Sequence, residues 1–386
     1  MSDKSDKITP INPEQDKKRR RRRLILSLSG TVLLILAALA VFLNFDRIRD
    51  LFSSKSSSVS ASEYSFDDHS SNLYRAPRGG GLAIASIAGL EIYKPSGEEA
   101  TAASAALDAP AIGVGRDLIL AYDVGGEHLC AAGPKCGVVL EKTLGGKLLD
   151  ADISAGDEIC WATAEDGRKT AITVLNSDQK EIYRWLSSTR YMPLCAIAEG
   201  GETLAAVAIG QKEGAFASEL QILRTDSEEP GPTAALGSQL ILDLDFVEKK
   251  KLCAVGEENL QFFNTDAEPL GSFSYGGAFL RDFTAEGRNF VLLVLNPSQA
   301  GSRSTLVTVD YSGGELGRAD LGEEILSVSA AGKYAAVLTG SGLRVYKDDL
   351  TLWAETDDTG SATDVVMRDD GSALLIGAGT AQIFKP

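Results

Sequence analysis

The stretch LLDADISAGDEICWATAEDGRKTAITVLNSDQKEI at residues 148–182 contains the pattern that decides the fold. Its first part, 148–163, consists of an apolar alternating run, a polar turn with glycine and a second apolar run. Its second part, 172–182, repeats this arrangement over a shorter span. Alternation of apolar and polar residues with Gly, Asp and Asn between the runs predicts two consecutive β-hairpins.

Both hairpin patterns recur along most of the chain. Further copies of the first lie at 109–122, 193–209, 240–255, 279–294, 325–339 and 362–377. Further copies of the second lie at 90–100, 128–139, 220–230, 260–270, 306–316, 343–353 and 381–386. Tyr93 and Phe384 end the same strand in the first and the last copy of the second pattern. Seven repeats separate them, so the period is about 42 residues. Four strands per period predict an all-β fold, a β-propeller of four-stranded blades. Eight blades fit the copies best, and seven is the alternative because the first blade is the weakest.

The last copy stops at Pro386 after its third strand. A blade without a fourth strand would leave an open sheet edge. We expect Glu63–Pro77, which precedes the first clear repeat, to supply that strand and close the ring. Residues 63–386 are therefore predicted to form one cooperative propeller domain.

An apolar run, LILSLSGTVLLILAALAVFL at residues 24–43, is long enough to cross a bilayer as a helix. Lys17–Arg23, KKRRRRR, precedes it and predicts that the N-terminus stays in the cytoplasm. Residues 1–23 then form a basic tail near anionic lipid, and the Ser-rich residues 44–62 form a linker. The expected location is the cytoplasmic membrane, with one span and the propeller outside. Ala38–Ala40 resembles a signal-peptide cleavage site, but the apolar run continues beyond it, which favours an uncleaved anchor.

The charge distribution is uneven. The chain carries a net charge of −16, and because residues 1–23 contribute +5, residues 24–386 contribute −21. An acidic domain of this kind is a poor ligand for nucleic acid or for anionic lipid headgroups. We therefore expect no nucleic-acid partner.

The five cysteines are irregularly spaced, which does not indicate a disulfide-rich framework. Cys130 and Cys136 flank the predicted hairpin loop AAGPK, and a disulfide between them is possible. The alternative is two small buried thiols. Cys160, Cys195 and Cys253 lie in apolar strand patterns and are expected in the core.

Residues that could carry chemistry are few. The two histidines, His69 and His128, have no partner at metal-ligand spacing. The chain contains no G-x-S-x-G elbow, no Walker A sequence and no complete dinucleotide-binding fingerprint. We therefore predict no catalytic residue and no cofactor.

Acidic pairs and tryptophans have a structural explanation as well as a functional one. Asp243/Asp245, Asp357/Asp358 and Asp369/Asp370 could hold a hard cation, but none forms a calcium-loop sequence, and Asp before Gly is ordinary turn chemistry. We predict no metal site.

Trp161, Trp185 and Trp353 lie in strands of different blades and are expected to pack between blades rather than to bind a ligand.

Several repeats resemble known propeller families. Asp123–Glu127, DVGGE, and Asp310–Glu315, DYSGGE, look like quinoprotein-like (PQQ-like) repeats. The turns in MRDDGSALLIG at 367–377 and TAEGRNFVLLV at 284–294 are similar to WD40-like and TolB-like blades. The layout of basic tail, single span, Ser-rich spacer and propeller resembles a family of single-pass proteins of unknown function from Gram-positive bacteria. Quinoprotein enzymes carry regular Trp docking motifs, and the three scattered Trp here depart from that pattern.

The expected function is that of a non-enzymatic, membrane-tethered scaffold that presents its loops and central opening to another envelope protein. The alternative is an extracytoplasmic ligand-binding or sensory module for cell-wall glycan or peptide. A hydrolase or oxidoreductase is a third possibility, against which a centre lined by Ala, Ser and Val would argue.

Overall fold

The computed structural model describes residues 58–60, 64–69, 71–299 and 303–386, all within the compact unit Ser57–Pro386. Over these ranges the chain forms β-strands and turns, without an α-helix. The described residues contain no helix long and apolar enough to cross a membrane. The predicted basic tail at 1–23 and the predicted span at 24–43 lie outside the described residues.

The strands form eight antiparallel sheets, or blades, and within blades 1 to 7 the strands follow chain order. Blade 1 contains β3 (Leu73–Arg75), β4 (Leu82–Ser86), β5 (Gly89–Tyr93) and β6 (Glu99–Ser104). Blade 2 contains β7 (Pro110–Val114), β8 (Ile119–Asp123), β9 (His128–Gly133) and β10 (Gly137–Thr143). Blade 3 contains β11 (Lys147–Ile153), β12 (Ile159–Ala164), β13 (Thr170–Leu175) and β14 (Glu181–Ser187). Blade 4 contains β15 (Tyr191–Ile197), β16 (Thr203–Lys212), β17 (Ala215–Arg224) and β18 (Thr233–Gly237).

The second half of the ring continues the pattern. Blade 5 contains β19 (Ile241–Glu248), β20 (Lys251–Gly256), β21 (Asn259–Asn264) and β22 (Pro269–Ser274). Blade 6 contains β23 (Phe279–Thr284), β24 (Phe290–Asn296), β25 (Ser304–Asp310) and β26 (Glu315–Leu321). Blade 7 contains β27 (Ile325–Ala331), β28 (Tyr334–Thr339), β29 (Gly342–Lys347) and β30 (Leu352–Thr356). Blade 8 contains β31 (Asp364–Met367), β32 (Ala373–Gly377) and β33 (Thr380–Lys385), with β1 (Ser58–Val59) and β2 (Tyr64–Ser65) paired to β33.

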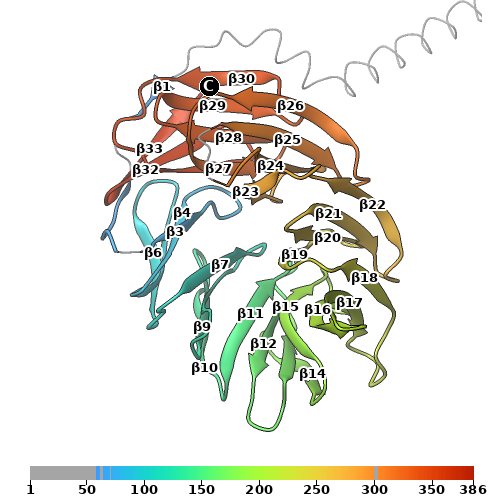
Figure 1. Cartoon of the computed structure of the whole chain (residues 1–386). Coiled ribbons are helices and arrows are strands. Elements are labelled where there is room, and N and C mark those ends of the chain that lie inside the picture. Colours follow the sequence, from blue (N-terminus) through green and yellow to red (C-terminus); the bar gives the residue numbers. More distant parts are fainter. Residues whose placement is uncertain (1–57, 61–63, 70, 300–302) are drawn as a thin grey trace, which may run out of the picture. The chain divides into compact units, whose positions relative to one another are not determined.

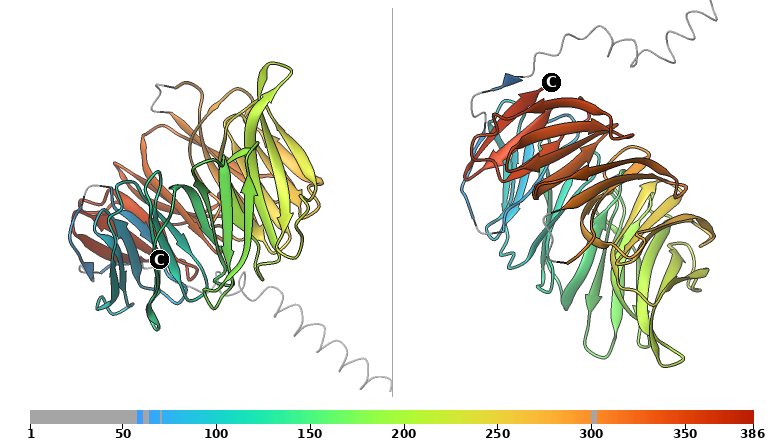
Figure 2. Two further views of the ribbon diagram at one scale, coloured as in Figure 1. Left: turned by 90° about the horizontal axis from the view of Figure 1, so that it is seen from below. Right: turned by 45° about the horizontal axis from the view of Figure 1, so that its top comes forward.

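The predicted β-propeller of eight four-stranded blades is therefore confirmed, and the seven-blade alternative is wrong. The first strands of the blades, such as β7, β11 and β19, lie toward the centre of the ring (Figure 1). First strands of successive blades contact one another from β3 to β19 and from β23 to β31. Blade 4 has the longest strands, and its β16–β17 hairpin projects beyond its neighbours as the yellow-green hairpin in Figure 2. Two residues with positive φ, Glu213 and Gly214, make the tight turn at its tip.

The ring closes through the N-terminal strands, although not where the sequence pattern places the closure. Within the predicted closing stretch Glu63–Pro77, only β2 pairs with β33, whereas β3 is the inner strand of blade 1. The remaining length of β33 pairs with β1, whose residues belong to the predicted linker 44–62. The reason is length, because the two residues of β2 cover only part of the six-residue β33. The backbone N–H of Ser60 continues the pairing with a 2.9 Å bond to the carbonyl of Ile383.

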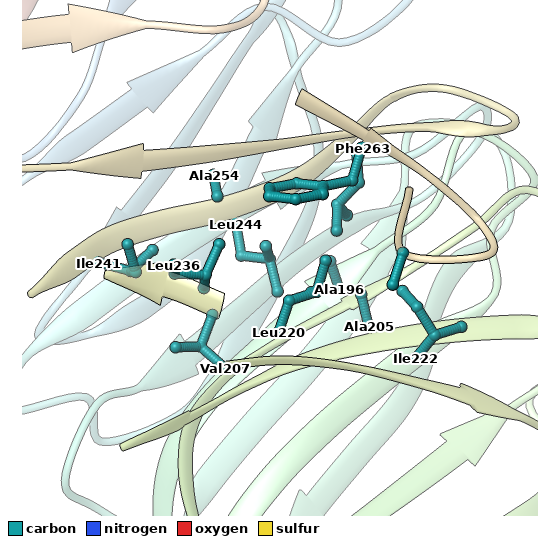
Figure 3. Close-up of a cluster of buried hydrophobic side chains, with 12 residues drawn as sticks. Ala196, Ala205, Val207, Leu220, Ile222, Leu236, Ile241, Leu244, Ala254 and Phe263 are labelled. Atoms are coloured by element: carbon teal, nitrogen blue, oxygen red, sulfur yellow. The ribbon is translucent and has the colours of Figure 1, made fainter. Parts of the chain in front are cut away.

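The apolar core consists of eight clusters, one in each interface between consecutive blades. Figure 3 shows the cluster between blades 4 and 5, where Leu220, Leu236 and Phe263 meet. The second and third strands of a blade face such a cluster on both sides, which explains continuous apolar runs such as β24. The three tryptophans also pack in interblade clusters, as predicted.

The interface between blades 8 and 1 is secured by Tyr64 of β2, which is 1% exposed. Its ring packs edge-on against Tyr93 of blade 1, with a centroid distance of 6.4 Å. Nη2 of Arg368, in the β31–β32 turn, donates to the Tyr64 hydroxyl at 2.9 Å and to the carbonyl of Gly81 at 3.1 Å. One arginine thus connects the N-terminal strand, blade 8 and blade 1.

We expect Tyr64→Ala to lower the free energy of unfolding by about 3 kcal/mol or more, because it leaves a cavity at the closing interface and removes a partner of Arg368. Phe216→Ala is the control, because Phe216 is 40% exposed on the β16–β17 hairpin. That change should shift the free energy by no more than about 0.5 kcal/mol. Urea unfolding of the full chain measures both, and equal effects would contradict the assigned closure.

Candidate functional site

Five consecutive inner strands share an irregularity in their pairing with the second strand of the blade. The ladder between the first and second strands shifts register in five consecutive blades, between Leu148/Asp150, Tyr191/Leu194, Ile241/Asp243, Leu280/Asp282 and Ile325/Ser327. Such bulges add a residue to one strand and redirect the chain. The residues that follow the shift, namely Asp150, Leu194, Asp243, Asp282 and Ser327, therefore occupy equivalent positions. Three of these five positions carry a carboxylate.

Four partly buried carboxylates, Asp150 and Asp152 on β11 and Asp243 and Asp245 on β19, form a group that we call the inner carboxylates. Burial raises the pKa of Asp150 and of Asp152 to about 7, and repulsion from neighbouring carboxylates adds to the effect. Burial also raises the pKa of Asp243 and Asp245, and the charge of Asp152 raises that of Asp245 further. The carboxylates of blade 3 and those of blade 5 therefore repel one another, although blade 4 lies between these blades in the ring.

Two of the inner carboxylates have a structural role. Oδ2 of Asp150 accepts the backbone N–H of Cys195 at 2.9 Å, and Oδ2 of Asp152 accepts that of Ile197 at 2.8 Å. Both bonds join β11 to β15 of the next blade. In blade 7 the hydroxyls of Ser327 and Ser329 make the same connection to β31 of blade 8. These positions therefore align neighbouring inner strands.

Asp243 and Asp245 make no comparable hydrogen bond to the next blade in the described part of the chain. Each accepts a backbone hydrogen bond only from the residue that follows it, Leu244 or Phe246. The positive charge of Arg75 on β3 lowers the pKa of Asp243. Arg75 itself pairs with Glu286 of blade 6, with Nε and Oε1 2.7 Å apart. The centre of the ring therefore holds more negative than positive charge, and Asp243 and Asp245 are its least compensated carboxylates.

Large apolar side chains are exposed where the inner strands of blades 4 to 7 begin. We call this set the apolar rim. Its members are 36% to 47% exposed and are Tyr191, Leu240, Leu242, Phe279 and Leu326. Along β19 the rim residue Leu242 directly precedes the carboxylate Asp243. Exposed apolar side chains at the starts of neighbouring strands make this edge of the ring a candidate interaction surface.

A cavity of about 260 Å³ opens beside the rim between blades 6 and 7. Asp282, Glu324 and Arg281 line it together with the apolar Ile325 and Leu326. Burial raises the pKa of Asp282, and the negative charge of Asp364 adds to this effect. Neither Asp282 nor Glu324 forms an ion pair with another described residue. The cavity suits a cationic group on an aliphatic stem.

A second cavity, of about 350 Å³, lies between blades 2 and 3 and includes Cys136, Asp157 and Gln179 in its wall. One of its three carboxylates serves the fold, because Asp157 accepts the backbone N–H groups of Asp117 and Leu118 at 3.0 and 3.1 Å. Asp157 and Gln179 both have positive φ, which reflects the tight turns that bound this cavity.

The cysteines differ in part from expectation. Cys130 and Cys136 are free thiols, so the disulfide considered between them is not present in the structure. The reason is strand geometry, because β9 directs Cys130 into the buried cluster between blades 1 and 2, whereas Cys136 is exposed in the following turn. Cys160, Cys195 and Cys253 are buried in the core, as predicted.

The other singled-out residues lie apart from the inner carboxylates. Nδ1 of the partly buried His128 lies 3.3 Å from the hydroxyl of Thr143 on the neighbouring strand, and His69 lies in the segment between β2 and β3. Asp370 accepts the N–H and hydroxyl of Ser372 within its own turn, in keeping with the predicted turn chemistry. Asp357 and Asp358 lie in the exposed segment between β30 and β31. Within the described residues no three His, Cys, Asp or Glu side chains are grouped as a metal site.

The group that sequence reasoning missed is the set of inner carboxylates as a whole. Among the acidic pairs singled out from the sequence, Asp243/Asp245 stands as an isolated pair, and Asp150/Asp152 is not included. The signal was present, because D-x-D occupies the same repeat position in 148–163 and 240–255. The centre is therefore not lined by Ala, Ser and Val alone, and the prediction of a non-enzymatic chain stays a prediction.

The raised pKa values predict a pH dependence of stability. The folded chain keeps protons on Asp150 and Asp152 up to about pH 7, whereas the unfolded chain releases them near pH 4, so the free energy of unfolding should fall from pH 5 to pH 8. Asp243→Asn removes a repelling charge and should raise Tm at pH 8 by about 2–5 °C, with less effect at pH 5. Calorimetry at both pH values measures this. The exposed Asp358→Asn is the control, and a lower Tm of Asp243→Asn at both pH values would contradict the repulsion.

Comparisons with known proteins agree with the propeller and identify a family. The chain is similar in structure to the C-terminal WD40 domain of Sif2, with a TM-score of 0.57, 10% identity, and coverage of 84% of this chain and 98% of that one. It is also similar to BamB from Moraxella catarrhalis, with a TM-score of 0.45, 13% identity, and coverage of 86% and 97%. A chain of the mitotic checkpoint complex gives 0.45, 11% identity, and coverage of 86% and 95%. No curated protein sequence matches the chain. The model of the family of unknown function DUF5711 matches residues 53–380, and the chain therefore belongs to that family.

Proposed function

We propose that this chain is a non-enzymatic scaffold, tethered to the outer face of the cytoplasmic membrane, which docks another envelope protein on its apolar rim. The observation that carries the proposal is the exposure of Leu242, Phe279 and Leu326 near the starts of three consecutive inner strands, β19, β23 and β27. Side chains of this type, when clustered in a shallow site with polar surroundings, provide the anchoring contacts of protein interfaces.

The charge beside the rim indicates the chemistry of the partner. Asp243 follows Leu242 along β19, and Asp282 and Glu324 line the adjacent cavity without an ion pair among the described residues. A docking segment that interleaves Lys or Arg with apolar residues would place its apolar side chains on the rim and its cations beside these carboxylates. Such complementarity speeds association and makes it sensitive to salt.

Tethering would keep this surface near the membrane. The predicted span ends at Leu43, and the first strand of the ring begins at Ser58. The 14 residues between them reach at most about 50 Å when fully extended. A ring held within that distance would meet partners that are themselves in or close to the membrane.

The cavity between blades 6 and 7 supports an alternative, a sensory module for cell-wall glycan or peptide. Its wall includes the polar Asn296 and Ser304, which are hydrogen-bonded to each other at 2.9 Å, beside carboxylates and apolar residues. A small ligand that binds the folded chain in this cavity would raise Tm by an amount that grows with the logarithm of its concentration above Kd. Wall fragments that raise the Tm of the full chain, with the same effect in Leu242→Ser, whose side chain does not line the cavity, would favour this alternative.

The docking proposal is tested by purification of the tagged full chain from detergent-solubilised membranes. We expect a stoichiometric partner that dissociates as salt is raised and that is lost with the double variant Leu242→Ser/Leu326→Ser. The matched control is Ile182→Ser/Leu186→Ser, because these residues of the outer strand β14 are equally exposed, at 43% and 44%. Both variants should keep the Tm of the parent. Absence of a stoichiometric partner, or equal loss in the control, would refute the proposal.

A further inference from the structure

The interface between blades 3 and 4 brings two thiols together. Cys160 on β12 and Cys195 on β15 are 35 residues apart in sequence, yet their Sγ atoms lie 3.6 Å from each other. Their exposures are 0% and 1%. Apolar side chains such as Ile172, Val174 and Met192 surround the pair in one cluster.

Strand β11 holds both cysteines in this arrangement. Cys160 lies opposite Asp152 in the ladder between β11 and β12. Cys195 donates its backbone N–H to Asp150 of β11 at 2.9 Å. Because both backbones are attached to neighbouring parts of one strand, the two side chains meet as a consequence of blade packing.

We propose that Cys160 and Cys195 form an interblade disulfide when the chain folds in the presence of a disulfide oxidant. The thiolate of one cysteine attacks the disulfide of the oxidant, such as oxidised glutathione, and releases one thiol. The second cysteine then attacks the resulting mixed disulfide and releases the other thiol. The two cysteines lose two protons and two electrons, and the oxidant becomes two thiols. The Sγ atoms must approach by about 1.5 Å to reach bonding distance.

The burial of the pair determines when this reaction can take place. Burial raises the pKa of the Cys160 thiol, and the contact between the two sulfur atoms, together with burial, raises that of Cys195. The closed interface also excludes an oxidant. Exchange therefore precedes the packing of blade 3 against blade 4, and the finished disulfide is protected from reductants in the folded ring.

The repeat provides an internal control for this pair. Cys253 lies opposite Asp245 in blade 5, as Cys160 lies opposite Asp152 in blade 3. Its cluster contains Phe283 of blade 6, at the position that corresponds to Cys195. Cys253 therefore has the same environment within its blade but meets an aromatic ring in place of a thiol.

The test uses the full chain, purified with reductant, unfolded in guanidinium and refolded with reduced and oxidised glutathione. After alkylation and digestion, mass spectrometry should find one cross-linked peptide pair containing Cys160 and Cys195, lighter by two hydrogen atoms than the two reduced peptides. Cys253 should be alkylated. The oxidised chain should show a Tm about 5 °C or more above that of chain refolded with dithiothreitol, because the cross-link restricts the unfolded chain.

Two variants complete the experiment. Cys253→Ala should keep the cross-link and the Tm difference, whereas Cys195→Ala should lose both. If Cys195→Ala fails to refold, the peptide map of the unaltered chain still shows whether Cys160 and Cys195 are cross-linked. Recovery of Cys160 and Cys195 as alkylated thiols from soluble, cooperatively unfolding protein would overturn the proposal, and so would a cross-link between Cys130 and Cys136 in their place.

Discussion

The structure depends on the pairing of β33 with β1 and β2, because no blade can bury its own faces. Each apolar cluster is formed by two neighbouring sheets. If the two ends of the chain did not join, the first and the last blade would each lack a neighbour on one face. Pairing of Val59 with Phe384 and of Tyr64 with Ala381 completes blade 8. It also covers the apolar faces of blades 8 and 1, which an open chain would expose to water. We therefore expect the eight blades of the closed ring to unfold cooperatively.

Closure also brings the inner strands together, and with them charges that are distant in sequence. The bulge repeats in five consecutive inner strands, and the carboxylates of blades 3 and 5 raise one another's pKa. Asp150 and Asp152 offset part of the cost of their burial by accepting backbone N–H groups from β15. Asp243 and Asp245 lack this compensation in the described structure, so they oppose the stability of the ring at neutral pH. Buried charges that destabilise the folded state are typical of functional sites. The exposed apolar rim beside these carboxylates agrees with a binding function.

The same repeat geometry decides which cysteines meet. Proximity in sequence suggested Cys130 and Cys136, but alternation along β9 places one thiol in an interblade cluster and leaves the other in a turn. Cys160 and Cys195 meet because one lies on the second strand of blade 3 and the other on the first strand of blade 4. In a propeller, contacts between side chains of consecutive repeats are as regular as contacts within a repeat.

The sequence by itself determined the all-β class and the blade size and favoured eight blades over seven, because hairpin periodicity is a local property that each copy expresses separately. The position of D-x-D in 148–163 and 240–255 was equally visible. Only the tertiary structure decided that these pairs act on one another across the centre, that Ser58–Val59 is part of the ring, and that Cys160 faces Cys195. The physical reason is that these contacts join residues from different blades. Their distances follow from the bulges, the strand lengths and the closure of the ring, which no single repeat specifies.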